Sequence, residues 1–221
     1  MSHTRTLFLA TLGAAIALFT AIVTWDVLHQ RGIRMQQSLA AKNLSVADHP
    51  RLGSAGAPVT ILEFADFKCT SCKYWQTHVL PVLWRDAIRP GKAKLYFFAF
   101  PIINKDSFTA AEAAYSVYRQ RPAAFWTFAD ALYRHQQAEA AIWATPSFLA
   151  RLIAADVPGV DARQVLRDLA DGRERTSVER DLAAGERLGV NATPSVFVNG
   201  QPVPDPLDAS QIESMIKAAM R

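Results

Sequence analysis

The chain has 221 residues, 50% of them hydrophobic, and a formal net charge of +4. This length leaves room for one sizeable core beside a membrane segment, which excludes a large multidomain assembly and predicts a single folded domain. The Lys and Arg residues are scattered along the chain, a distribution that argues against a nucleic-acid partner.

The amino-terminal residues predict a membrane anchor. From Thr6 to Trp25 the chain carries no charge, and about 20 such residues suffice for a helix to cross the hydrocarbon core of a bilayer. We therefore expect residues 1–25 to be an uncleaved signal anchor, with residues 6–25 in the lipid bilayer as a transmembrane helix. The alternative is a signal peptide removed on export, although such peptides have a shorter apolar region and a cleavage site of small residues. Residues 26–55 are expected to be a polar tether.

The rest of the chain, residues 56–221, alternates between segments that favour strands and segments that favour helices. Runs of β-branched and aromatic residues predict strands, whereas Ala-rich amphipathic segments predict helices. The first helix contains Pro81, which cannot donate a backbone hydrogen bond and should kink the helix near residues 78–81. The expected elements are strand Pro58–Phe64, helix Cys69–Ile88, strand Lys94–Phe100, several helices over 106–188, a hairpin of Ser195–Val198 and Gln201–Val203, and helix Asp208–Arg221.

The order of these elements predicts the fold class. A strand, a helix, a strand, a hairpin and a last helix form an α/β arrangement of the thioredoxin type. Here a helical insertion of about residues 106–188 interrupts it. The turn Asn199-Gly200 supports the hairpin, because both residue types tolerate positive φ angles.

Cys69 and Cys72 are the only cysteines of the chain. Two cysteines exclude a framework of structural disulfides, and no second ligand pair stands at the spacing of a structural zinc site. Cys69 would begin a helix, where free backbone N–H groups and the helix dipole stabilise a thiolate. We predict that Cys69 is the nucleophile and that Cys72 resolves the mixed disulfide. The hydroxyl of Thr70 or Ser71 is a candidate donor to the thiolate.

Two segments carry a resemblance to a known family. Glu63–Cys72 (EFADFKCTSC) and Gly189–Gly200 (GVNATPSVFVNG) resemble the DsbA-like branch of the thioredoxin superfamily, and the likeness extends over about residues 55–221. It implies a thiol–disulfide oxidoreductase whose redox centre is the cysteine pair, with no bound cofactor. The dipeptide Thr70-Ser71 is neither the Pro-His of strong periplasmic oxidases nor the Gly-Pro of thioredoxins, so the redox direction does not follow from the resemblance.

The resemblance also implies roles for residues outside the cysteine pair. The Thr193-Pro194 bond is expected to be cis and to lie against the cysteines, leaving the Thr193 backbone to bind an extended substrate chain; a trans proline opening a strand is the alternative. Glu63 stands where the family commonly carries a buried acid that could relay the Cys72 proton. A solvated glutamate fits the sequence equally well. Independently of the resemblance, Lys68 stands just before Cys69 and could add a favourable positive charge there, although a lysine exposed at the surface contributes little.

The predicted activity is that of a protein thiol–disulfide oxidoreductase, with a dithiol oxidase as the first choice of direction. Its partners would be reduced or misfolded secreted proteins and a membrane redox partner. It would be a single-pass protein of the cytoplasmic membrane with its catalytic domain in the periplasm, or soluble in the periplasm after cleavage. The alternatives are a reductase or isomerase, for example in cytochrome c maturation, and a copper(I)-binding module or chaperone without redox turnover, since two thiolates suit a soft ion.

Overall fold

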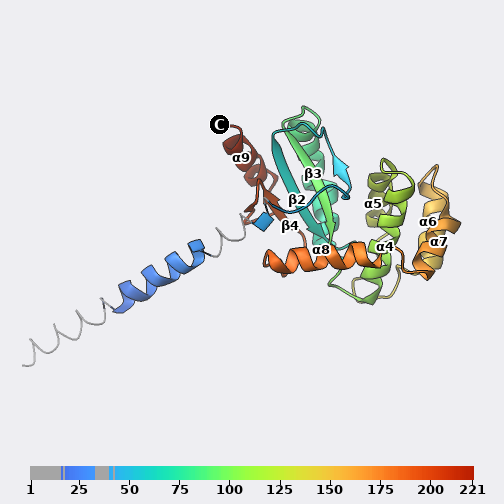
Figure 1. The fold of residues 1–221 in the computed structure, drawn as a ribbon, viewed down its shortest axis with the longest axis horizontal. Coiled ribbons are helices and arrows are strands. Elements are labelled where there is room, and N and C mark those ends of the chain that lie inside the picture. Colours follow the sequence, from blue (N-terminus) through green and yellow to red (C-terminus); the bar gives the residue numbers. More distant parts are fainter. Residues whose placement is uncertain (1–15, 17, 33–39, 42) are drawn as a thin grey trace, which may run out of the picture.

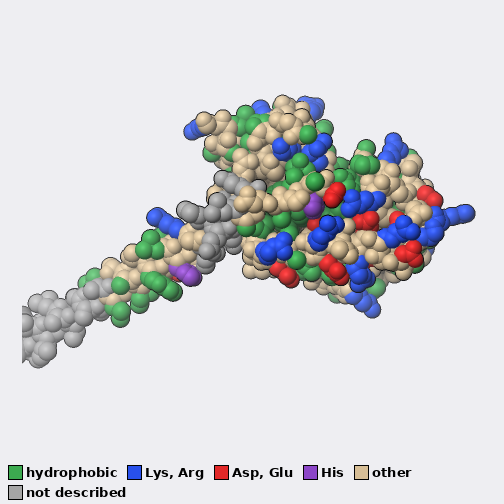
Figure 2. All heavy atoms as spheres, in the orientation of Figure 1, with side chains coloured by type: hydrophobic (Ala, Val, Ile, Leu, Met, Phe, Trp, Pro, Cys, Tyr) green, Lys and Arg blue, Asp and Glu red, His purple; other side chains and the backbone are tan. Residues whose placement is uncertain are grey.

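The computed structural model describes residues 16, 18–32, 40–41 and 43–221 (Figure 1). Residues 18–32 are helical, and Figure 2 shows apolar side chains exposed along this helix. In the described part of the chain, no helix is long and apolar enough to cross a bilayer. The predicted span, residues 6–25, falls partly outside the description, because residues 6–15 and 17 are not included. The membrane anchor therefore stays a prediction.

A five-stranded sheet forms the centre of the domain, with the strand order β1-β3-β2-β4-β5. The two central strands, β2 and β3, run parallel, and all other neighbouring pairs are antiparallel. Helices cover both faces of these central strands, which accounts for their nearly continuous apolar sequences. The β4–β5 hairpin turns at Asn199 and Gly200, both with positive φ, as their sequence predicts. The strands are β1 (Arg51–Leu52), β2 (Val59–Ala65), β3 (Ala93–Ala99), β4 (Ser195–Val198) and β5 (Gln201–Pro202).

The segment expected to be a tether, residues 26–55, contributes its last part to the domain. Strand β1 pairs antiparallel with β3. Immediately before it, the His49 ring stacks on Phe98, and its Nε2 lies 2.8 Å from the Asp181 carboxylate. The folded domain therefore begins earlier than the expected residue 56. A two-residue strand has no periodic pattern of its own and becomes visible only through its pairing.

The helix predicted from Cys69 to Ile88 is present, but it is not a regular α-helix. Two of its turns are π-helical, and the first of them lies immediately before Pro81. There the Leu80 amide donates to the Trp75 carbonyl, five residues back. This widened turn lies in the region of the expected kink and accommodates Pro81, which has no N–H with which to continue the regular pattern. The consecutive parts are α2 (Thr70–Tyr74), η1 (Trp75–Val79), α3 (Leu80–Leu83) and η2 (Trp84–Ile88).

The insertion consists of five helices, and the expectation of several helices over residues 106–188 is confirmed. Side chains of Asn104, Thr145 and Asp161 cap three of them, which satisfies amides that the first helical turn leaves free. In Figure 1, α4 to α7 lie to one side of the sheet, and α8 leads back to it. They are α4 (Lys105–Gln120), α5 (Ala124–Arg134), α6 (Pro146–Asp156), α7 (Ala162–Ala170) and α8 (Arg175–Arg187).

The packing of the helices places the cysteines at a junction. The helix that begins after Cys69 and the last helix, α9 (Ala209–Ala219), pack on one face of the sheet. Helix α8 packs on the other face. Cys69 and Cys72 belong instead to a third cluster, in which the ends of β2 and β3 meet helices α4 to α7. The two cysteines therefore lie between the sheet and the helical insertion.

Candidate active site

The loop after β2 carries Cys69 to the beginning of helix α2. The Cys69 amide donates to the Asp66 carbonyl at 3.0 Å, and the backbone of Cys69 is extended at the N-cap position. Cys69 and Cys72 are both free thiols, with exposed fractions of 5% and 0%. Cys69 thus stands where the first free amides of the helix point, and Cys72 lies behind it in the core.

The surroundings of the two thiols favour opposite protonation states. Hydrogen bonds that the Cys69 thiolate would accept, first from the Cys72 thiol and then from the Thr193 hydroxyl and the amides of Cys72 and Ser71, lower the pKa of Cys69 from 9.0 to about 6 against the effect of burial. Burial, followed by the hydrogen bond with Cys69 and the charges of Cys69 and Glu63, raises the pKa of Cys72 well above 9.0. At neutral pH, Cys69 can attack as a thiolate while Cys72 keeps its proton.

The Thr193–Pro194 peptide bond is cis, as the resemblance implies, and it lies against the nucleophile. The Cys69 thiol donates to the Thr193 carbonyl at 3.2 Å. The Thr193 hydroxyl is buried and has no hydrogen-bond partner among the described residues. When Cys69 loses its proton, its sulfur changes from donor to acceptor, and this hydroxyl is then available to it.

Glu63 is buried on β2 rather than solvated at the edge of the sheet. Its exposed fraction is 2%, and its Oε2 atom has no hydrogen-bond partner within the described ranges. Burial raises the pKa of this carboxyl from 4.5 to about 8, because an apolar surrounding disfavours the charged form. The carboxyl is therefore mostly neutral at pH 7, and once it ionises its negative charge raises the pKa of Cys72 further.

The Thr70 hydroxyl does not point to the nucleophile. It donates to the Glu139 carboxylate at 2.9 Å, and the Thr70 amide donates to the same oxygen at 2.7 Å. The bonds that hold Cys69 as a thiolate come instead from Cys72, Thr193 and the backbone of the first turn. Glu139 comes from the connection between α5 and α6, and nothing in the local sequence pattern indicates that it reaches this helix.

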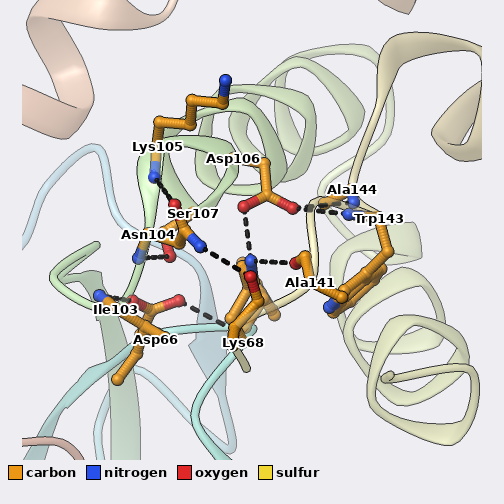
Figure 3. A network of polar contacts seen from close by, with 12 residues as sticks. Asp66, Lys68, Ile103, Asn104, Lys105, Asp106, Ser107, Ala141, Trp143 and Ala144 are labelled. Atoms are coloured by element: carbon orange, nitrogen blue, oxygen red, sulfur yellow. Dashed lines mark hydrogen bonds and ion pairs between the residues drawn. The ribbon is translucent and has the colours of Figure 1, made fainter. Parts of the chain in front are cut away.

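Lys68, expected at the surface, is completely buried. Its ammonium group donates to the Asp106 carboxylate at 2.5 Å and to the Ala141 carbonyl at 2.6 Å (Figure 3). The other Asp106 oxygen accepts from the amides of Trp143 and Ala144. The ion pair therefore holds the segment 138–144 against the loop that carries Cys69. The sequence offers no signal for this contact, because the partners are 38 positions apart.

Replacing Lys68 by methionine is expected to lower the free energy of unfolding by about 2–4 kcal/mol. The change leaves the Asp106 carboxylate buried without its cation, and breaking a buried ion pair in this way costs roughly 3–5 kcal/mol; the two remaining amide donors reduce that cost. Urea denaturation would measure the effect. Lys105→Met, the same substitution at an exposed neighbouring lysine, is the matched control. Equal stability of the two variants would contradict a structural role for the buried pair.

Comparison with known proteins finds matches to a family model, to curated relatives and to solved structures. The family model described as thioredoxin matches residues 45–218. The chain is 33% identical over 192 residues to the "Probable disulfide bond formation protein D" of Bacillus anthracis, covering 87% of this chain and 88% of that protein. It is 29% identical to the "Disulfide bond formation protein D" of Bacillus subtilis, covering 80% and 79% of the two chains. The crystal structure of oxidised BdbD from Bacillus subtilis matches with a TM-score of 0.76 and 29% identity, covering 80% and 95%. The chain thus belongs to the thioredoxin family and is a DsbA-like protein thiol–disulfide oxidoreductase.

Proposed function

We propose that the chain is a dithiol oxidase that transfers a Cys69–Cys72 disulfide to reduced or misfolded secreted proteins. The observation that carries this direction is the opposite ionisation of the two thiols. A Cys69 thiolate stabilises the dithiol form, and a protein whose reduced form is stabilised is a strong oxidant. The names of these relatives, which refer to disulfide bond formation, support the same direction.

The proposed reaction consists of two exchanges. A substrate thiolate attacks the Cys69 sulfur, the Cys69–Cys72 bond breaks, and Cys72 leaves as a thiolate that takes up a proton. Glu63, buried and neutral at pH 7, is the group proposed to relay that proton. A second substrate thiolate then attacks the substrate sulfur of the mixed disulfide, and Cys69 leaves as a thiolate. Two substrate thiols are oxidised and one protein disulfide is reduced.

The cis-proline loop is proposed to bind the substrate chain during these steps. In the dithiol form the Thr193 carbonyl accepts from the Cys69 thiol. Once Cys69 is in a disulfide it has no proton to donate, so this carbonyl becomes free for an amide of an extended substrate. Thr193 and Pro194 would then hold the substrate beside the sulfur that it attacks.

The proposed site of action is outside the cytoplasm. The uncharged run from Thr6 to Trp25 would anchor the chain in the cytoplasmic membrane, with the domain in the periplasm and a membrane redox partner to reoxidise it. Disulfide donation suits an oxidising compartment, which supports this placement. Mass analysis of the mature amino terminus would distinguish the retained anchor from a cleaved signal peptide and a soluble periplasmic protein.

The reduction potential of the cysteine pair tests the proposed direction. We expect the full-length chain, equilibrated with glutathione buffers in detergent, to have a potential well above that of a reducing thioredoxin and closer to about −120 mV, the value of strong oxidants. A value near about −270 mV would contradict the oxidase and indicate a reductase supplied with electrons from the membrane. Thiol trapping followed by mass analysis would measure the fraction of each form.

A further inference from the structure

The connection between α5 and α6 places a carboxylate beside the nucleophile. Glu139 is partly buried, and one of its oxygens accepts both the amide and the hydroxyl of Thr70, the residue that follows Cys69. Thr70 is the only interaction partner of this carboxylate within the described ranges. The nearby Lys68 does not neutralise it, because its ammonium group is bound to Asp106 and Ala141.

Glu139 and the Cys69 sulfur share the same helix beginning. The first amide, that of Thr70, bonds to Glu139, whereas the amides of Ser71 and Cys72 act on the Cys69 sulfur. These amides and the helix dipole are the positive groups that stabilise a thiolate. The carboxylate and the Cys69 sulfur are therefore bound to successive amides of one helix start.

The position of Glu139 is enforced from the core. The buried Lys68–Asp106 pair fixes Ala141, Trp143 and Ala144 (Figure 3), and these residues lie in the same connection as Glu139. The backbone that follows Glu139 is thereby fixed, and the two bonds from Thr70 hold the carboxylate itself at the helix start.

We propose that Glu139 is a positioning residue that limits the oxidising strength of the cysteine pair, because its carboxylate disfavours the dithiol form with its Cys69 thiolate relative to the disulfide form. The inference rests on the proposed function of Cys69 and Cys72 as the redox pair. In the reaction with glutathione, two glutathione thiols reduce the protein disulfide. The products are one glutathione disulfide, the Cys69 thiolate, the Cys72 thiol and one released proton. Only the product side carries the thiolate that Glu139 repels.

Glu139→Gln tests this inference, because the amide oxygen can still accept from Thr70 while the charge is removed. Even with the screening of bulk water, two unit charges about 4 Å apart interact strongly enough to change an equilibrium constant by roughly fivefold. We expect the equilibrium constant for reduction by glutathione to rise by about that factor, which corresponds to a potential about 20 mV higher. The pKa of Cys69, followed by thiolate absorbance, should fall.

Two controls separate electrostatics from loop structure. Glu186→Gln removes a charge from an exposed position on α8 and should leave the equilibrium constant unchanged. The effect of Glu139→Gln should also shrink in about 1 M salt, where charges in contact with solvent are screened within about 3 Å. Thr70→Val, which removes one of the two bonds to Glu139, should raise the equilibrium constant by a smaller factor.

The outcomes separate this inference from the proposed function. If the natural protein does not exchange with glutathione, or if its Cys69 ionises like an ordinary thiol, the proposed function fails before any variant is compared. If the natural protein behaves as proposed but Glu139→Gln leaves its equilibrium constant unchanged or lowers it, the inference about Glu139 alone is overturned. A rise that persists undiminished in high salt would also overturn it, because it would indicate an altered loop instead of a removed charge.

Discussion

Cys69→Ser is expected to abolish disulfide exchange, with a loss of more than about a thousandfold in rate, because the only thiol that ionises near neutral pH is removed. Cys72 cannot replace it, since it is fully buried and its pKa is raised by that burial. Cys72→Ser should behave differently: the remaining Cys69 still forms mixed disulfides, but it lacks the internal thiol that resolves them.

Oxidation of a reduced substrate peptide and mass analysis under non-reducing conditions would measure both effects. Cys72→Ser is expected to accumulate as a covalent adduct with the substrate, whereas Cys69→Ser is expected to form none. The two variants are matched controls for each other, because each loses one sulfur atom from the same core cluster. Adducts on Cys72 in the Cys69→Ser protein would show that the assignment of nucleophile and resolving thiol is reversed.

Glu63→Gln is expected to stabilise the protein at high pH and to have little effect at low pH. Burial raises the pKa of Glu63 from 4.5 in the unfolded chain to about 8 in the folded one, so the fold favours the neutral form. Compared with a carboxyl group that is charged at every pH, Glu63 contributes stability to the folded protein that is fully present below pH 4.5. This contribution is lost as the pH rises through 8. At pH 9 the natural protein must keep a charged carboxylate in its core, at a cost of about 4–5 kcal/mol.

Urea denaturation of the disulfide form at pH 4.5 and pH 9 would test this dependence, because oxidation of the cysteines removes their own titration. The glutamine variant should be more stable than the natural protein by a few kcal/mol at pH 9 and nearly equal to it at pH 4.5. Glu186→Gln, at an exposed position, should change neither value appreciably. A stability difference that is the same at both pH values would exclude a titrating carboxyl at position 63.

The geometry of the proposed redox centre could be predicted from sequence because its parts are local. Cys69 and Cys72 stand between an apolar run and a helical segment, and a separation of three positions along a helix start places the two thiols on the same face, within reach of each other. The hairpin at Asn199-Gly200 follows from the positive φ angles that these residues tolerate. The cis bond before Pro194 was implied by the motif around it and is present in the structure.

The contacts between segments far apart in the chain became visible only in the tertiary structure. Lys68 was expected at the surface because a lysine is rarely buried without a partner, and its partner, Asp106, lies 38 positions away. Glu139 reaches Thr70 across 69 positions, and β1 exists only through its pairing with β3. The sequence by itself determined where the two sulfur atoms of the proposed redox pair lie, since local periodicity and turn preferences depend on neighbouring residues. The charges that surround those atoms depend on packing of the helical insertion against the sheet, which no local pattern encodes.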